Sequence, residues 1–209
     1  MNHIFKITFS LILLIFVNSC TYSQNANAPS RDCIALNNQG VEYISNYPMN
    51  GKSGINQAID LLQQAIQCDS TYLTAYINIA NAYDKNHNYD GEMRAYNKIL
   101  KLTNYDSPSI ITQKGVLFEK INKIDSAKKY YDIAKIACKK KLIKHPEDAE
   151  IIKELILLKA LIIGKDEALK EIDEQIKLHP GLQEKLSGEY EYYKIFDRHA
   201  YIYDLPIEK

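Results

Sequence analysis

The sequence has no tryptophan, few glycines (8) and few prolines (6), and no excess charge, with 26 basic and 26 acidic residues among 209. The scarcity of turn-forming residues argues against a turn-rich β sandwich. The 46% of hydrophobic residues is enough for the core of an all-helical domain. Balanced charge leaves no electrostatic footprint for nucleic acid, so we set that class of partner aside.

The sequence also lacks the motifs that carry common chemistries. It contains no G-x-G-x-x-G loop or P-loop for a phosphate, no G-x-S-x-G nucleophile elbow and no H-E-x-x-H zinc motif. Its histidines stand apart from one another and from cysteine at metal-ligand spacing: His3, His87, His145, His179 and His199. We therefore expect no enzyme, no cofactor and no metal site.

Long hydrophobic runs are absent as well. The apolar stretch near the start, residues 7–17, has eleven residues, whereas crossing a bilayer takes about 20. It follows Lys6 and has the proportions of a secretory signal. The next residues complete the tetrad Val17-Asn18-Ser19-Cys20, which resembles a bacterial lipobox.

That resemblance implies that residues 1–19 are a lipoprotein signal peptide and that Cys20 receives a diacylglyceryl lipid. The alternative is an ordinary signal peptide that happens to contain a cysteine. Residues 20–32 are polar and without helical period, as expected of a flexible tether. The protein is then exported and anchored to a bacterial membrane, the outer rather than the inner, because Thr21 is not the aspartate that favours retention in some bacteria.

Helical periodicity is clearest from Tyr76 onward. Tyr76, Ile79, Ala80 and Tyr83 follow the i, i+3, i+4, i+7 spacing of one helix face. Residues 84–91, DKNHNYDG, then interrupt the pattern with turn formers before helical spacing resumes. The pattern predicts a helix hairpin whose two helices approach closely at the small residue.

The same pattern recurs with Gly40, Ala80 and Gly115 at the small position, and more weakly with Ile156. It resembles the tetratricopeptide repeat (TPR), a helix–turn–helix unit of 34 residues. The resemblance implies an all-α fold, a right-handed α-solenoid of about four units plus a C-terminal capping helix. The expected repeats are residues 33–72, 73–107, 108–148 and 149–182 of a domain over 33–182, and the cap and tail are 183–209. Glu92 and Lys114 depart from the pattern, since alanine and an aliphatic residue are usual there.

The resemblance further implies a non-catalytic scaffold that binds a protein or peptide partner, with no small-molecule substrate. In this family the partner lies along exposed positions of the first helices, which here are Asn37, Val41, Thr74, Ile77, Asn78, Asn81, Asp84, Ser109, Thr112, Val116 and Glu119. The alternative is a permanent structural subunit of an envelope secretion or outer-membrane assembly complex. Tyrosines cluster over residues 190–203; we expect them in the end cap, and the alternative is a separate docking surface.

Three cysteines follow Cys20. Cys33 is expected to begin the first helix of the first repeat and Cys68 to end its second helix, so an antiparallel hairpin brings them together. Two outcomes stay open for this pair, a disulfide that persists outside the cytoplasm or two separate buried thiols. Cys138 is expected to be a buried free thiol.

Overall fold

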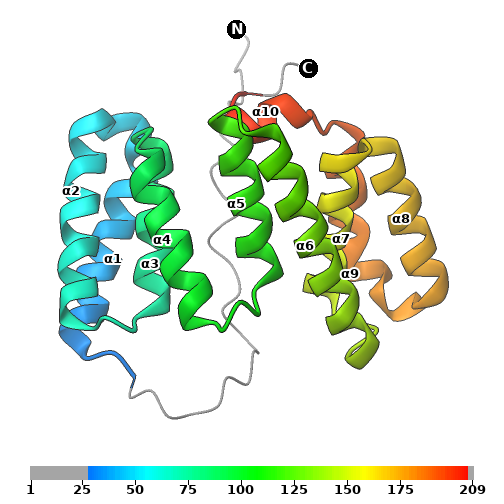
Figure 1. Cartoon of the computed structure of the whole chain (residues 1–209), viewed down its shortest axis with the longest axis horizontal. Helices are drawn as coiled ribbons and strands as arrows, with labels where there is room; N and C mark the ends of the chain where they lie inside the picture. Colours follow the sequence, from blue (N-terminus) through cyan, green and yellow to red (C-terminus); the bar gives the residue numbers. More distant parts are fainter. Residues whose placement is uncertain (1–27, 207–209) are drawn as a thin grey trace, which may run out of the picture. The chain divides into compact units, whose positions relative to one another are not determined.

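The computed structural model describes residues 28–206. This part of the chain is all-α, and its helices follow one another as hairpins (Figure 1). They are α1 (Arg31–Ser45), α2 (Tyr47–Cys68), α3 (Leu73–Lys85), α4 (Tyr89–Leu102), α5 (Pro108–Lys120), α6 (Ile124–Lys144), α7 (Ala149–Ile162), α8 (Lys165–Leu178), the short 3₁₀ helix η1 (Pro180–Leu182), α9 (Gln183–Lys194) and α10 (Arg198–Tyr203). The predicted all-α fold of paired helices is confirmed.

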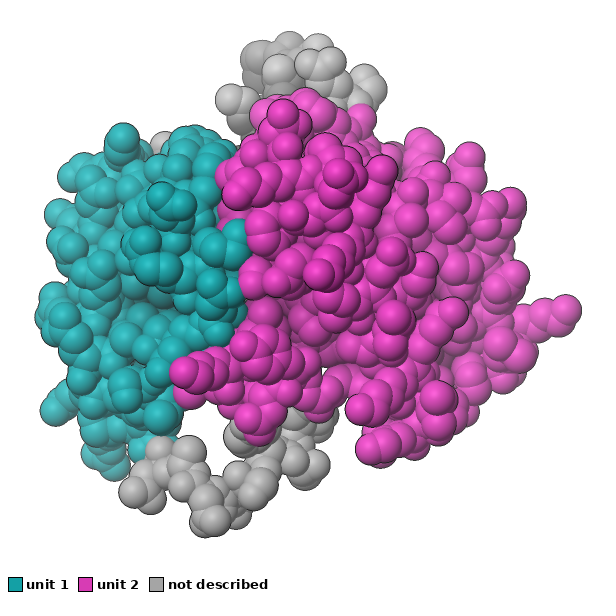
Figure 2. All heavy atoms as spheres, viewed as in Figure 1, with its two compact units in different colours: residues 1–99 teal, residues 100–209 magenta. Residues whose placement is uncertain are grey.

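The chain divides into two compact units, residues 1–99 and residues 100–209, with the boundary inside α4 (Figure 2). We call them the N-terminal unit and the C-terminal unit and describe each by itself. The described N-terminal unit holds α1 to α3 and most of α4. The C-terminal unit holds α5 to α10.

Small residues allow the helices of a hairpin to approach closely, as the sequence predicted. In the N-terminal unit, a Cβ added to Gly40 would lie 2.7 Å from Cγ of Leu62. In the C-terminal unit, a Cβ added to Gly115 would lie 2.6 Å from the Tyr131 ring. Real Cβ atoms do not come this near other heavy atoms, so both positions require glycine as long as the partner side chain stays in place.

Two of the turns between the helices of a hairpin contain a left-handed residue that is not glycine. His87 has φ 54° between α3 and α4, and Asn122 has φ 59° between α5 and α6. The residue after each donates its amide to the carbonyl five positions earlier, at 2.8 Å in both turns. His87 is thus a turn residue, and its place in the predicted turn over residues 84–91 follows from backbone geometry.

Two helices are longer than the repeat pattern requires. α6 has 21 residues where α4 and α8 have 14, so it is longer by about two turns. α2 has 22 residues and is interrupted at Gly51, whose φ of 58° and ψ of −154° are not helical. Residues 47–50 therefore form a short helical segment between α1 and the regular part of α2.

The two departures from the repeat pattern are both accommodated in the interior. Glu92 on α4 is 3% exposed and Lys114 on α5 is 8% exposed. The Lys114 ammonium lies 4.7 Å from the centre of the Tyr130 ring, where the face of the ring attracts a cation. A lysine at an aliphatic position is tolerated because its stem is buried while its charge meets an aromatic ring.

The C-terminal cap consists of two helices rather than one. The sequence predicted a single capping helix after residue 182, but the chain breaks at residues 195–197 before α10. Asp197 caps α10 and accepts a hydrogen bond from the amide of Ala200 at 2.7 Å. Leu186 of α9 and Ile202 of α10 are 0% and 1% exposed, so both helices contribute to the core of the C-terminal unit.

Candidate functional site

The predicted partner-binding positions fall in both units. In the N-terminal unit an amide pair links two first helices: Asn78 on α3 donates from Nδ2 to Oδ1 of Asn37 on α1 at 2.8 Å. Asn37 in turn donates to Oδ1 of Asn38 at 3.2 Å, and only 3% of it is exposed. Asn37 was predicted to be exposed, and that prediction is wrong: its side chain is a buried link between α1 and α3.

The remaining predicted positions of the N-terminal unit are partly exposed, namely Val41, Thr74, Ile77, Asn78, Asn81 and Asp84. Most of them lie on α3 at the i, i+3, i+4, i+7 spacing that places them on one face of the helix. This face carries two amides and a hydroxyl around Ile77. Amides both donate and accept, as does the backbone of an extended peptide, and an aliphatic side chain supplies apolar contact.

In the C-terminal unit the corresponding positions are mostly covered. Ser109 is exposed, but Thr112, Val116 and Glu119 are 0%, 4% and 9% exposed. The prediction that these three α5 residues are open to a partner is therefore wrong in this structure. For Glu119 the physical reason is a contact with the last helix, α10.

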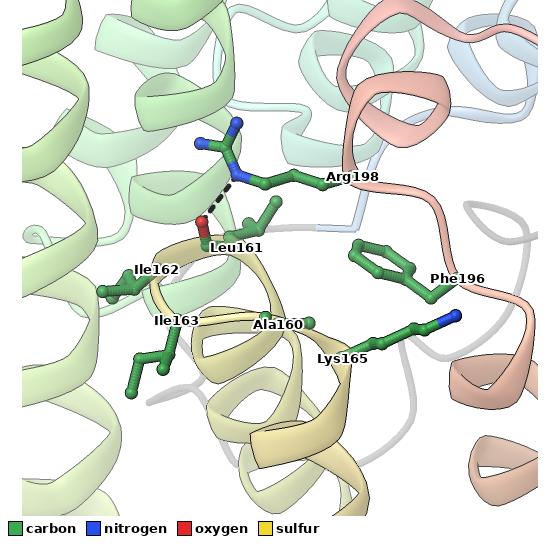
Figure 3. Close-up of a pocket in the computed structure, with 8 residues that line it drawn as sticks. Ala160, Leu161, Ile162, Ile163, Lys165, Phe196 and Arg198 are labelled. Atoms are coloured by element: carbon green, nitrogen blue, oxygen red, sulfur yellow. Dashed lines mark hydrogen bonds between the residues drawn. The ribbon is translucent and has the colours of Figure 1, made fainter.

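Glu119 lies at the centre of a network that joins four helices, α5, α6, α7 and α10. Its Oε1 and Oε2 pair with the two terminal nitrogens of Arg198 on α10, at 2.7 and 2.8 Å. The hydroxyl of Tyr131 on α6 donates to the same Oε2 at 3.0 Å. The third arginine nitrogen, Nε, donates to the carbonyl of Leu161 at the end of α7 at 2.7 Å (Figure 3). Planar two-point pairing of this kind is among the strongest polar contacts in proteins.

The position of Tyr131 follows from Gly115. Because Gly115 has no side chain, the Tyr131 ring packs directly against α5. Its hydroxyl then reaches Glu119, four residues further along the same helix as Gly115. Burial and the Glu119 charge raise the pKa of Tyr131 above its ordinary value, so this phenol stays protonated and remains a donor.

A second contact holds α10 to α5. Gln113 donates from Nε2 to the hydroxyl of Tyr201 at 3.0 Å. Tyr201 also stacks on Phe196 at 5.7 Å between ring centres, and Phe196 lies 5.3 Å from Tyr193 of α9. Most of the tyrosine cluster is thus packed inside the cap, while Tyr203 stays 43% exposed.

Sequence reasoning missed Gln113 and Arg198. Gln113 lies four residues after Ser109 and three before Val116, so the helical spacing could have placed it on the same face. Arg198 is separated from Glu119 by 79 residues, and no local pattern marks it. We call Gln113, Glu119, Tyr131 and the Leu161 carbonyl the Glu119 site.

Another carboxylate, Glu154, was also missed and lies on α7. Glu154 Oε1 is fully enclosed and has no hydrogen-bond partner among the described residues. Burial raises the pKa of Glu154 to about 7, against which a hydrogen bond from Thr112 acts in the opposite direction. Burial also raises the pKa of three neighbouring groups, the hydroxyls of Tyr193 and Tyr201 and the thiol of Cys138. The pKa of the Cys138 thiol is raised to about 12. Glu154 therefore changes its charge near neutral pH.

A pocket of about 210 Å³ lies beside Arg198, between the α7–α8 turn and the segment before α10 (Figure 3). Residues 160–164 line it together with Lys165, Phe196 and Arg198, so its walls are mostly aliphatic. The Arg198 side chain is 44% exposed, which means that solvent reaches it from the surface while its nitrogens bind inward. Within residues 28–206, no group of three or more His, Cys, Asp or Glu side chains is placed to hold a metal ion.

Cys33 and Cys68 form a disulfide in the N-terminal unit, with 5.6 Å between their Cα atoms. This is the pair for which the sequence left a bridge and two separate thiols open. Ser30 caps α1 by accepting from the Cys33 amide at 3.4 Å, which places Cys33 at the start of the helix. Cys138 is a buried free thiol.

The predicted lipid anchor, Cys20, lies outside the described residues, as do the predicted signal peptide and most of the predicted tether. Among the helices that the structure describes, none combines the length and the apolar character needed to cross a membrane.

No family model matches the chain, and no curated protein sequence matches it. The fold is similar to that of TTC0263, a thermophilic TPR protein in Thermus thermophilus, with a TM-score of 0.51 and 17% identity over 79% of this chain and 83% of that one. MamA of AMB-1 is more distantly similar, with a TM-score of 0.42 and 16% identity over 78% of this chain and 82% of that one. YrrB, a TPR protein with an unusual peptide-binding site, has a TM-score of 0.38 and 17% identity over 85% of this chain and 91% of that one. The fold is thus that of a TPR-like helical repeat protein.

Proposed function

We propose that the chain is a non-catalytic scaffold, anchored by lipid to a membrane of the bacterial cell envelope, that binds a protein or peptide partner. The TPR-like fold supports a scaffold, because hairpins repeated along a chain present a row of similar helix faces for contact. The lipobox-like tetrad ending at Cys20 supports the anchor.

The observation that carries the proposal is the partly exposed polar face of α3 in the N-terminal unit. Thr74, Asn78 and Asn81 lie there around Ile77, between residues that form the core. Asn78 is already oriented by its bond to Asn37. A pre-oriented amide next to an aliphatic residue suits an extended peptide, whose backbone needs donors and acceptors and whose side chains need apolar contact.

A crosslinking pull-down from membranes tests this proposal. Asn81→Arg places a bulky charge on the α3 face, and we expect it to abolish partner recovery while leaving the melting temperature nearly unchanged. Gln64→Arg is the matched control, since Gln64 is exposed on the second helix of its hairpin. Equal recovery with Asn81→Arg and Gln64→Arg would contradict binding at α3.

The alternative function, a permanent structural subunit of a secretion or outer-membrane assembly complex, predicts a different state of the protein. Extraction in a mild detergent should then release the chain only within a stable assembly. A reversible scaffold should instead be extracted largely as a free chain. The anchor is tested separately: mass spectrometry should find a diacylated Cys20, and Cys20→Ser should release the protein from the membrane fraction.

A further inference from the structure

The second half of α6 carries exposed isoleucines that the core of the C-terminal unit does not use. Ile136 and Ile143 are 65% and 82% exposed, and their spacing of seven residues places them on one face of the helix, two turns apart. One exposed aliphatic side chain is common on a protein surface, but two in register on a helix are a candidate contact surface. We define the α6 stripe as these two isoleucines and the four lysines that flank them: Lys129, Lys135, Lys139 and Lys140.

The lysines of the α6 stripe lie on both sides of the isoleucines. At about 100° of rotation per residue, Lys135 and Lys139 fall on one side of the line joining the isoleucines, and Lys129 and Lys140 fall on the other. Asp132 lies on the same face and pairs with Lys135 at 3.1 Å. The other three lysines pair with no carboxylate among the residues that the structure describes. The stripe is therefore an apolar line with positive charge along both edges.

Part of the α6 stripe lies on the extra length of α6. The last seven residues of this helix, 138–144, are the amount by which it exceeds α4 and α8, and they include Lys139, Lys140 and Ile143. The inner side of this segment is fixed to the C-terminal unit, because Cys138 is buried and Lys141 pairs with Asp106 at 3.1 Å. The extra turns therefore hold the outer side, with its lysines and Ile143, in a defined position facing solvent.

We propose that the α6 stripe lies against the surface of a membrane that contains anionic phospholipid. A basic amphipathic helix face binds at the boundary between headgroups and acyl chains, through its apolar area and through attraction to anionic lipid. In this arrangement Ile136 and Ile143 contact the upper part of the acyl chains, and the flanking lysines place their ammonium groups at the level of the phosphates. The inference rests on the proposed function in taking the chain to be held at a membrane, and it adds which face meets that membrane.

A pocket of about 250 Å³ next to the α6 stripe suits a lipid headgroup. Lys135 and Lys139 line one side of it, and aliphatic residues of α7 and of the turn that follows line the other: Leu155, Ile162 and Ile163. Lys159 also lines the pocket but is paired with Glu171, so the available positive charge comes from α6. The pocket thus offers an ammonium group to a phosphate and aliphatic walls to the first carbons of its acyl chains.

A membrane is favoured over a protein as the occupant. The core of a protein interface is depleted of charged residues, and lysine is rarer at interfaces than on the rest of the surface, whereas here lysines line both edges of the apolar line. In a two-fold dimer of this face the lysines of two copies would meet each other, and like charges repel. An anionic membrane offers opposite charge and apolar chains over a continuous surface. The proposed anchor at Cys20 would keep the stripe near it, so weak attraction by each lysine is sufficient.

The test uses the absence of tryptophan from the chain. Ile143→Trp introduces one tryptophan into the α6 stripe of the protein, which is purified from membranes and reconstituted into vesicles whose phospholipid is brominated near the headgroup and quenches tryptophan on contact. Met49→Trp is the matched control, since Met49 is 80% exposed in the N-terminal unit. We expect strong quenching of Ile143→Trp in vesicles containing phosphatidylglycerol and little in pure phosphatidylcholine. Equal quenching at both positions, or in both kinds of vesicle, would overturn the proposal.

Two double variants of the Ile143→Trp chain test the role of the lysines. Lys139→Gln/Lys140→Gln removes two positive charges from the stripe, and we expect the ratio of docked to undocked chains to fall by about tenfold or more in anionic vesicles. Lys170→Gln/Lys177→Gln removes two exposed lysines from α8 of the same unit and should leave that ratio nearly unchanged. If the two double variants behave alike, the quenching reflects net charge and the α6 stripe is not the contact surface.

A chain with Cys20→Ser and Ile143→Trp separates docking from the anchor. Added to vesicles, it should shift its emission to shorter wavelength more with anionic than with neutral lipid, and about 1 M salt should reverse the shift. A reporter that ignores lipid charge in both the membrane-purified and the Cys20→Ser chain would overturn docking, whereas an unmodified Cys20 in mass spectrometry would overturn the anchor alone. An emission shift that grows with protein concentration in the absence of vesicles would identify a second copy as the occupant and would also overturn the proposal.

Discussion

The two units carry the same kind of helix face and use it differently. On α3 of the N-terminal unit the positions between core residues stay partly exposed, and an amide pair is their cross-helix link. On α5 of the C-terminal unit the equivalent positions are buried, and Glu119 is paired with Arg198 of the last helix. Whether such a face is available to a partner is thus decided by sequence far along the chain as much as by the helix itself.

The largest expected effect is a loss of stability in the N-terminal unit alone. The Cys33–Cys68 disulfide has a sequence separation of 35, and closing such a loop contributes roughly 3 to 4 kcal/mol in the chain-entropy model. We expect Cys33→Ser/Cys68→Ser to destabilise α1 and α2 by about this amount, measured as native-state hydrogen exchange. Amides of α9 in the C-terminal unit serve as the internal reference. An equal loss of protection in α9 would contradict an effect confined to the N-terminal unit.

The second effect concerns the C-terminal unit and depends on pH. Burial raises the pKa of Glu154 to about 7 from an ordinary value of 4.5, so between these values the folded state binds a proton that the unfolded state does not. Unfolding free energy should therefore fall as pH rises from about 4.5 to 7 and then level off. Each tenfold change in an acid constant is worth about 1.4 kcal/mol, which gives a loss of roughly 2 to 3 kcal/mol between pH 5 and pH 8.

Glu154→Gln is the variant that isolates this effect, since its neutral amide has the shape of the protonated acid. Urea denaturation at pH 5 and pH 8 should show the loss in the wild-type chain and a much smaller one in the variant. Identical pH dependence in the two proteins would assign the loss to other groups.

The third effect tests how the Glu119 site is supported. A methyl group at position 115 would meet the Tyr131 ring at 2.6 Å, so Gly115→Ala should move Tyr131 away from Glu119. We expect a loss of about 2 kcal/mol of unfolding free energy, in the range for overpacked cores. Gly188→Ala on α9 is the matched control, because nothing lies within 4 Å of its added Cβ. It should stabilise the protein by about 0.5 to 1 kcal/mol through helix propensity, and a loss with this control would contradict the steric explanation.

The smallest effect tests the hydrogen bond between Asn78 and Asn37 in the N-terminal unit. Asn78→Ala removes the donor to the buried Oδ1 of Asn37. A buried acceptor left without its partner costs about 1 to 2 kcal/mol, and we expect a decrease of about 1 kcal/mol by urea denaturation. Asn81→Ala should change the same quantity by less than about 0.5 kcal/mol. If the two variants lose equal stability, the amide pair is not the link that distinguishes Asn78.

The sequence predicted the helix hairpins well, because their signals are local. The small residues at positions 40 and 115 and the turn at His87 each act through neighbours within one hairpin. The burial of the α5 face against α10 was not predictable in this way. Arg198 meets Glu119 across 79 residues, and the burial of Glu154 depends on packing contributed by several helices. Helical periodicity identifies the face of a residue but not what lies against that face.

The disulfide has a mechanical consequence for a chain held at one end. Under the proposed anchoring at Cys20, any tension on the protein enters the fold just before α1. At Cys33 the force passes through the sulfur bridge to Cys68, and the 34 residues between them carry none of it. Fully stretched, that loop would measure roughly 110 to 120 Å at about 3.3 to 3.6 Å per residue. The disulfide prevents this extension, so tension cannot unravel the part of α1 and α2 between the two cysteines. The force acts instead on the start of α3.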